Sequence, residues 1–224
     1  MARSIGVLGN GKIKCLSSSP TKENQISFYG HGRPMHAFMY LGTWLDITND
    51  FLQSSEELSW EFADGFDVIV EDTSFQMYGD NRTEQIKFIS KVLKKNGILI
   101  LNEKLNGVDY EKREDQKDLS FKSRFFSLKS IENKKNIILK TMSQNQVSLK
   151  SLTDALSYSF RAAVCIWNSG NFYSIAASNN IQYLKEFTAC LIPPCIPKEF
   201  SYHLIPFALF GLNNDEVTFR DYET

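Results

Sequence analysis

The sequence predicts an α/β fold in which a parallel sheet ends in an antiparallel hairpin. Two apolar runs, 66–71 and 98–103, are predicted to be buried strands, and the helical pattern between them has the length of a right-handed parallel crossover. Further along, strand-like runs at 162–167 and 172–177 flank Asn-Ser-Gly-Asn, which is typical of a tight hairpin turn. These three observations define the predicted architecture.

The helix between the two buried strands has its own start and stop signals. Asn81, with Glu84 three residues later, has the spacing of a capping box. Asn96-Gly97 is predicted to end the helix, because glycine accepts the left-handed conformation. Apolar residues fall on one predicted helical face: Ile86, Ile89, Val92 and Leu93.

The bulk composition is that of a soluble globular chain. The 224 residues suffice for one domain, at most with an appendage; 42% are hydrophobic and 23% are charged. The net charge of −1 gives no whole-chain electrostatic case for a dedicated nucleic-acid binder, although a local basic face stays open.

Four cysteines and three histidines, without paired Cys-x-x-Cys spacing, predict neither a zinc site nor a disulfide framework. The start, MARSIGVLGNGKIKC, has no apolar signal core, and the stretch Leu204–Leu212 is too short to span a bilayer. We therefore expect a cytoplasmic protein with reduced thiols, no metal and no membrane segment.

Two regions lie outside the predicted sheet. The middle, 105–147, contains the mixed charge run KREDQKD, predicted as a solvated helix face. A helical pattern follows it, which either covers the carboxyl ends of the strands or forms only a surface layer. In the tail, 190–224, four of the six prolines fall between 193 and 206, which excludes a long helix. The tail is predicted to pack on the core of a single domain, 1–224, or on a protein partner.

The stretch FDVIVEDTSF places two acids directly after an apolar run. Val68, Ile69 and Val70 fit a strand that is buried on both faces, but Glu71 and Asp72 do not. Acids at the carboxyl end of such a strand mark either a solvated loop or a ligand site in an open α/β sheet.

This order of elements resembles the second half of the class I S-adenosylmethionine-dependent methyltransferase fold. FDVIVED looks like the fourth strand of that family, KVLKKNGILILNEK like its fifth helix and strand, and LTDALSYSFRAAVCIWNSGNFYSIAASN like its last helix and final two strands. The resemblance covers roughly residues 66–180. It implies a three-layer Rossmann-like sandwich that lacks part of the usual first half.

The resemblance also implies a cofactor site for S-adenosylmethionine. In QISFYGHGRPMHAFMYLG we expect a strand at 26–29, a turn at Gly30-His31-Gly32 that approaches the cofactor, and a helix at Pro34–Leu41. A strand at 44–48 would place Asp46, or Asp50, near the ribose hydroxyls. The chain departs from the family pattern, because Phe28-Tyr29 stands where an acid is expected before the glycines. The alternative is that Gly30-His31-Gly32 is a plain turn between a strand and a helix, with no contact to a cofactor.

For catalysis, the resemblance points to Asp72 and Lys104 at the carboxyl ends of the two buried strands. Asp72 could orient an amine or take a proton from a hydroxyl, or it could only cap the following turn. Lys104 could lower the pKa of an acceptor hydroxyl, or form a surface salt bridge. The two functional hypotheses are methyl transfer to an unidentified acceptor and a catalytically degenerate fold that serves as a structural or binding subunit.

Overall fold

A computed structural model describes residues 1–107, 116 and 119–220. The predicted charge run KREDQKD lies outside the described residues, apart from Gln116. The chain divides into two compact units, Met1–Gly65 (unit 1) and Phe66–Thr224 (unit 2), which are described one at a time. None of the helices in the described part of the chain is both long and apolar enough to cross a membrane.

Unit 1 contains a two-stranded parallel sheet whose strands are joined by a helix. Cys15 lies opposite Ala37, and Ser19 lies opposite Leu41. The amide of Gly42 donates to the carbonyl of Ser19 over 3.0 Å and so ties together the carboxyl ends of both strands. The elements are α1 (Ala2–Leu8), β1 (Cys15–Ser19), α2 (Lys22–Tyr29), β2 (Ala37–Leu41), the 3-10 turn η1 (Trp44–Asp46), α3 (Asn49–Ser54) and α4 (Ser59–Phe62).

The element predictions for unit 1 are wrong. Residues 26–29 end helix α2, because the polar stretch Lys22–Gln25 extends the short apolar run into a helix, and periodicity alone does not separate the two. The expected helix at Pro34–Leu41 is instead strand β2, whose Ala-Phe-Met-Tyr-Leu pairs with β1. The expected strand at 44–48 is a 3-10 turn, in which Thr43 and Asp46 form a capping box.

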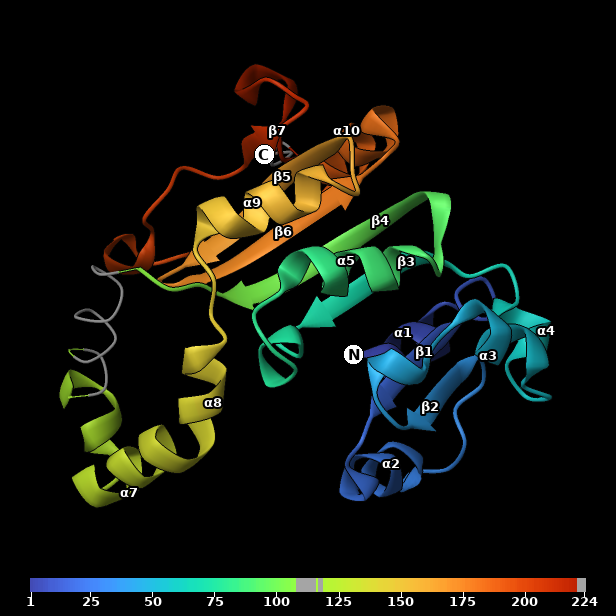
Figure 1. The fold of residues 1–224 in the computed structure, drawn as a ribbon, viewed down its shortest axis with the longest axis horizontal. Coiled ribbons are helices and arrows are strands. Elements are labelled where there is room, and N and C mark those ends of the chain that lie inside the picture. The colour runs from blue at the N-terminus through green and yellow to red at the C-terminus, as the bar shows by residue number, and fades with distance from the viewer. Residues whose placement is uncertain (108–115, 117–118, 221–224) are drawn as a thin grey trace. The chain divides into compact units, whose positions relative to one another are not determined.

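Unit 2 is a mixed α/β unit with a five-stranded central sheet in the order β3-β4-β6-β5-β7 (Figure 1). Its strands are β3 (Phe66–Asp72), β4 (Leu93–Lys104), β5 (Ala162–Ser169), β6 (Phe172–Ser178) and β7 (Phe207–Phe210). Its helical elements are η2 (Phe75–Met77), α5 (Arg82–Ser90), η3 (Lys122–Arg124), α7 (Leu128–Asn133), the π-helical stretch η4 (Lys134–Ile138), α8 (Leu139–Gln144), α9 (Leu149–Ser157), α10 (Ile181–Cys190), η5 (Lys198–Phe200) and η6 (Asn214–Glu216).

The predicted parallel pair is confirmed. Strands β3 and β4 are adjacent and parallel, with Val68 opposite Ile98 and Asp72 opposite Asn102. Helix α5 connects them, and the side chain of Asn81 accepts the amide of Glu84 over 3.2 Å, as its capping position predicts. The helix ends at Ser90 rather than before Gly97, because the chain already pairs with β3 at Leu93.

The predicted antiparallel hairpin is also confirmed. Strands β5 and β6 pair antiparallel, and β6 lies between β4 and β5. The Asn168 side chain stabilises the turn, since its Nδ2 donates to the carbonyls of Gly170 over 3.0 Å and of Phe172 over 3.1 Å. The parallel pair and the hairpin are therefore as the sequence predicts, and the structure adds that β6 joins them by pairing with β4.

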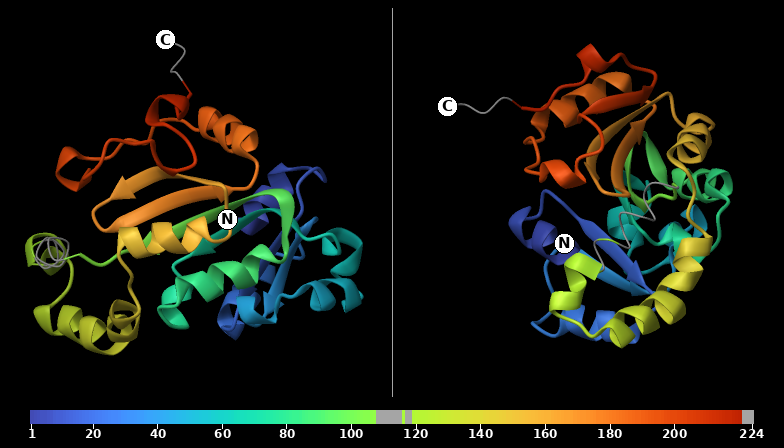
Figure 2. Two further views of the ribbon diagram at one scale, coloured as in Figure 1. Left: turned by 45° about the horizontal axis from the view of Figure 1, so that its top comes forward. Right: turned by 90° about the vertical axis from the view of Figure 1, so that its left-hand side faces the viewer.

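Helices cover both faces of this sheet and make unit 2 a three-layer sandwich. Helices α5 and α9 lie on one face, and α10 lies on the other (Figures 1 and 2). The core on the α10 side is a cluster of six buried residues: Ile98, Ala162, Val164, Ala176, Leu184 and Val217. Burying these side chains stabilises the packing of α10 on the sheet.

The proline-rich region beyond Cys190 contributes to unit 2 in two places. Strand β7 pairs antiparallel with β5 and extends the sheet at that edge. Val217 is buried in the core cluster beside Leu184. Other residues of this region, Ile192 and Leu204, are exposed.

Candidate functional site

The carboxyl ends of β3 and β4 bring the two predicted catalytic residues to one edge of the sheet. Asp72, the last residue of β3, lies opposite Asn102 of β4, and Lys104 ends β4 two residues further on. Asp72 is exposed. Among the described residues its carboxylate makes no hydrogen bond or ion pair, whereas the Lys104 Nζ lies 5.9 Å from the ring centroid of Phe172.

The turn after β3 is capped by Glu71 and not by Asp72. Glu71 is buried, and its Oε1 accepts the amide of Ser74 over 2.5 Å, the hydroxyl of Ser74 over 2.9 Å and the amide of Phe75 over 2.8 Å. Two of these bonds satisfy the backbone amides at the start of η2, and the third satisfies the Ser74 hydroxyl. Strand alternation then directs Asp72 away from Glu71, so the two acids have separate environments.

Thr73, between Asp72 and this turn, has a strained backbone. Its φ is +56°, a conformation that β-branched residues rarely adopt. The amide of Thr73 donates to the carbonyl of Asn102 over 2.9 Å, which fixes the residue to β4. Strain of this kind persists only where its surroundings enforce it, and it gathers at functional sites.

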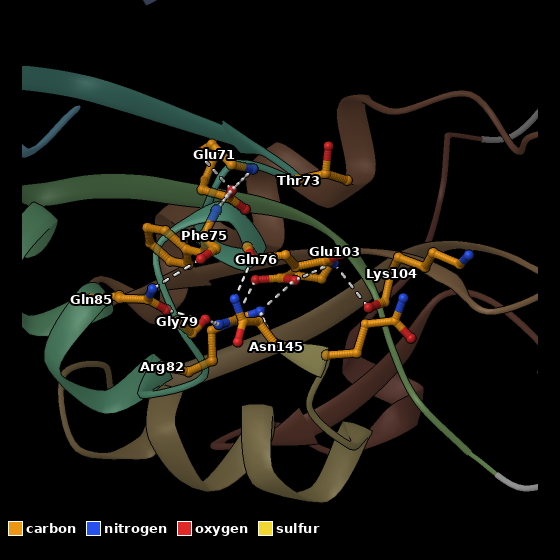
Figure 3. A network of polar contacts seen from close by, with 12 residues as sticks. Glu71, Thr73, Phe75, Gln76, Gly79, Arg82, Gln85, Glu103, Lys104 and Asn145 are labelled. Atoms are coloured by element: carbon orange, nitrogen blue, oxygen red, sulfur yellow. Dashed lines mark hydrogen bonds and ion pairs between the residues drawn. The ribbon is translucent and has the colours of Figure 1, made fainter. Parts of the chain in front are cut away.

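A buried ion pair lies beneath the same edge. Arg82 Nε donates to Glu103 Oε1 over 2.7 Å, and both side chains are almost fully buried. Arg82 also donates to the carbonyls of Gly79 over 2.8 Å and of Asn145 over 3.0 Å. The guanidinium therefore holds together the start of α5, the end of β4 and the region after α8 (Figure 3).

Three amide side chains complete this network (Figure 3). Gln76 donates to Glu103 Oε2 over 3.0 Å and to the carbonyl of Lys104 over 2.9 Å. Gln85 donates to the carbonyl of Phe75 over 3.0 Å, and Asn145 donates to the carbonyl of Gln76 over 2.8 Å. The network fills the space under the strand ends and makes them rigid.

Glu71 has an unusual electrostatic environment. Burial, and then the neighbouring Glu103 carboxylate, raise the pKa of Glu71 to about 8, against the lowering effect of the donors at Phe75 and Ser74. Among the described residues, two buried oxygens near this network lack a hydrogen-bond partner, Glu71 Oε2 and Gln76 Oε1. The raised pKa favours the protonated form of Glu71, in which the repulsion from the neighbouring Glu103 carboxylate is reduced.

The chain makes a long excursion from this edge and returns to it. Asn106, just after β4, donates two hydrogen bonds at its base. Its backbone amide donates to the carbonyl of Val147 over 3.0 Å, and its Nδ2 donates to the carbonyl of Gln146 over 3.0 Å. The two ends of the excursion are therefore bound to each other. Helices α7 and α8 lie between them, away from the sheet (Figure 1).

In unit 1, the predicted cofactor residues fall on opposite edges of the small sheet. Gly30-His31-Gly32 follows helix α2 and precedes β2, so it lies at the amino end of that strand. Arg3 donates to the carbonyls of this loop, at 2.7 Å to Phe28 and Gly32 and at 3.0 Å to His31. A Cβ at Gly32 would contact nothing within 4 Å, so no cradle surrounds it. The loop does not have the strand–glycine–helix geometry expected of it.

Asp46 lies after β2, on the carboxyl side of the sheet, where ligands of α/β sheets bind. Its Oδ2 accepts the Thr43 amide over 2.8 Å and the Thr43 hydroxyl over 3.1 Å. The strand–turn–helix geometry expected around Gly30 is found instead at Ser19-Pro20-Thr21, between β1 and α2. Ser19 Oγ accepts the amide of Thr21 over 3.2 Å and Asn24 Nδ2 over 2.9 Å in that turn.

Other candidate chemistries find less support among the described residues. They contain no cluster of three or more His, Cys, Asp or Glu residues that could hold a metal ion. All four cysteines are free, and burial raises the pKa of the Cys165 thiol to about 12. A thiol in that environment is a poor nucleophile.

Comparison with known proteins gave structural matches only. No family model and no curated protein matches the sequence. Among solved structures, the chain is similar to the cyclopropane synthase MmaA2 from Mycobacterium tuberculosis, with 14% identity, a TM-score of 0.41, and coverage of 68% of this chain and 48% of that one. The chain thus spans about half the length of that enzyme.

A second similar structure is an S-adenosylmethionine-dependent methyltransferase from Thermotoga maritima, described as a possible histamine N-methyltransferase. It has 17% identity and a TM-score of 0.43, and the match covers 79% of each chain. The fold assignment rests on the strand order and strand directions of unit 2.

Sequence reasoning missed most of the buried network. Arg82 carried one available signal, since a cation in the first turn of a helix opposes the macrodipole and needs a compensating partner. Its partner, Glu103, is 21 residues away, so the pairing itself was not readable. Glu71, and not Asp72, caps the turn because of the backbone direction in the residues that follow, and no sequence pattern specified that direction.

Proposed function

We propose that this chain takes part in methyl transfer from S-adenosylmethionine, with Asp72 and Lys104 on the acceptor side. The observation that carries the proposal is the position of these two residues. They share the carboxyl edge of adjacent parallel strands in a sheet of order β3-β4-β6-β5, where open α/β sheets bind ligands. The resemblance of this part of the sequence to class I methyltransferases supplies the reaction class.

Each side chain has a defined role in this proposal. Asp72 is exposed, has no partner among the described residues and is fixed by the strained turn at Thr73. It orients the acceptor or takes its proton. Lys104 places a positive charge at the same edge and thereby lowers the pKa of an acceptor hydroxyl. The cofactor supplies an activated methyl group, so the chain contributes chiefly positioning.

In unit 1, the carboxyl edge of β1 and β2 fits a cofactor better than the glycine loop does. We place the cofactor contact at Asp46 and the turn Ser19-Pro20-Thr21, because both follow parallel strands. The contact of Gly30-His31-Gly32 with the cofactor stays a prediction. Its location at the amino end of β2 favours the plain turn.

The second candidate function is a catalytically degenerate subunit that binds or supports a partner. The specific observation in its favour is the loop Gly30–Gly32, whose carbonyls are engaged by Arg3 and which has no cradle geometry. The proline-rich region after Cys190 is the proposed contact with such a partner.

Calorimetric titration of the full chain with S-adenosylmethionine, and separately with S-adenosylhomocysteine, distinguishes the two functions. Methyl transfer requires saturable binding in the range of enzyme substrates, about 1 μM to 1 mM. Absence of binding to both compounds over that range would reject the enzyme and leave the subunit.

A further inference from the structure

The region from Leu119 to Lys140, here called the basic–aromatic segment, combines two surface properties. It contains six basic residues and one acidic residue, Glu132, although the whole chain has a net charge of −1. The basic residues are Lys122, Arg124, Lys129, Lys134, Lys135 and Lys140. The segment therefore carries a net positive charge, whereas the rest of the chain is acidic overall.

Large aromatic side chains are exposed within the same segment. Phe121, Phe125 and Phe126 are 57%, 68% and 60% exposed. The rings of Phe121 and Phe125 lie 5.5 Å apart between centroids, at 60° to each other. A basic face that is merely solvated does not need three exposed phenylalanines, so these rings point to a ligand that offers flat apolar surfaces.

We propose that the basic–aromatic segment is a docking surface for single-stranded nucleic acid. Arg124, Lys129 and Lys134 neutralise phosphates, and the exposed phenylalanines stack on unpaired bases. A duplex would hide its base faces from these rings, which favours a single strand. The proposal stands on charge and exposure alone and does not depend on methyl transfer.

An anionic membrane is the main competing partner, and the helix geometry argues against it. Interfacial helices separate an apolar face from a charged face along one continuous helix. Here the 3-10 turn that carries Lys122 and Arg124 is flanked directly by Phe121 and Phe125. The following helix, α7, has six residues and passes into the π-helical stretch η4, which disturbs any regular face.

The position of the segment gives it a functional context. It belongs to the excursion whose base Asn106 closes by bonding to Gln146 and Val147. That base directly follows Lys104, at the end of β4. A nucleic acid strand bound by the segment is therefore held by a part of unit 2 that starts at the edge carrying Asp72 and Lys104.

Fluorescence anisotropy with the full chain and a labelled oligouridylate of ~20 nucleotides, longer than a typical single-strand site, tests the charges. The variant Arg124→Gln, Lys129→Gln, Lys134→Gln should bind at least about tenfold more weakly at low salt. Its plot of log K against log salt should be flatter by roughly 2, from three lost phosphate contacts. The matched control Lys22→Gln, Lys95→Gln, Lys198→Gln removes three exposed charges elsewhere and should bind like the parent. Equal losses in both variants, or no binding by the parent, overturn the proposal.

A second variant tests the stacking. Phe125→Ala with Phe126→Ala should weaken oligouridylate binding about tenfold or more while leaving the salt dependence unchanged, because it removes stacking and no charge. The parent should also prefer the single strand to a duplex of the same length. Unchanged affinity in the alanine variant, or binding to phosphatidylserine vesicles with none to the oligonucleotide, would overturn the proposal. Circular dichroism verifies that both variants fold.

Discussion

Arg82 and Glu103 lie side by side in the interior of unit 2, with the arginine Nε 2.7 Å from the glutamate Oε1. Arg82 begins a helix, Glu103 lies near the end of a strand, and neither side chain reaches solvent. The pair thus anchors the strand end that carries Lys104. Removing one partner leaves a buried charge without compensation.

The first prediction follows from that relationship. Arg82→Met should lower the free energy of unfolding by about 3–5 kcal/mol, because Glu103 then stays buried and unpaired. Urea denaturation measures the change. The double variant Arg82→Met, Glu103→Leu should recover part of the loss, since it buries no charge. As a control, Lys94→Met breaks the exposed pair with Asp67 and should cost no more than about 1 kcal/mol. A loss at Arg82 no larger than that of the control would contradict the prediction.

The second prediction concerns pH. The folded state raises the pKa of Glu71 from 4.5 to about 8, so between these values it holds a proton that the unfolded chain releases. This contribution to stability is fully present below about pH 4.5 and is lost as the pH rises through about 8, with a slope of at most about 1.4 kcal/mol per pH unit. Urea denaturation at several pH values should show a flatter profile for Glu71→Gln. The exposed control Glu186→Gln should keep the parent slope, and a parent-like slope in Glu71→Gln would disprove this assignment.

The third prediction tests Asp72. Asp72→Asn keeps the shape and removes the charge, so the rate of S-adenosylhomocysteine formation should fall about 10²-fold or more, while cofactor affinity changes little. Asp67→Asn changes an exposed acid at the other end of the same strand and should leave the rate unaltered. Full activity in Asp72→Asn would return Asp72 to the role of a solvated loop residue.

The fourth prediction tests Lys104. Without its positive charge, an acceptor hydroxyl keeps a higher pKa, so Lys104→Gln should shift the rising limb of the pH–rate profile to higher pH. Lys104→Arg retains the positive charge, so its rising limb should lie close to that of the parent protein. A uniform loss of rate at every pH in both variants would indicate a structural role.

The fifth prediction separates the two edges of unit 1. Asp46→Asn can still accept the bonds from Thr43 but loses its charge, and it should weaken S-adenosylmethionine binding in calorimetry. Gly32→Ala should leave that affinity unchanged, although strain at φ +88° lowers stability by about 1 kcal/mol. The reverse result would move the cofactor to the glycine loop.

Prediction from sequence succeeded for the pairing of the two apolar runs and for the turn. The runs at 66–71 and 98–103 are adjacent parallel strands, and Asn-Ser-Gly-Asn forms the tight turn. The expectation that 66–71 is buried on both faces is wrong, because β3 is the edge strand and Val68 and Val70 are 48% and 39% exposed. Prediction also failed in unit 1, where the runs around Ile26 and Phe38 are short and suit a helix or a strand equally well. The run around Phe38 is a strand because it pairs with Cys15–Ser19. Such non-local pairing cannot be recognised from the sequence of the run alone.

The convergence of Asp72 and Lys104 at one edge was predictable, but their surroundings were not. The carboxyl ends of neighbouring parallel strands converge whatever their sequence, which placed Asp72 and Lys104 together. Burial of Glu71, in contrast, is decided by three donors in the turn that follows it. A sequence pattern shows the acid but not the direction of the donors around it.

The base of the excursion is fixed to unit 2, because Asn106 bonds to Gln146 and Val147, and Asn145 bonds to Arg82 and Gln76. The separable part is therefore the stretch between Asn106 and α8. The chain leaves and re-enters at one point, so β4 and α9 would keep their places if the intervening length changed. Loop-closure entropy grows only slowly with length, by about 0.6 kcal/mol per doubling. A change in the length of this stretch should therefore cost the scaffold little.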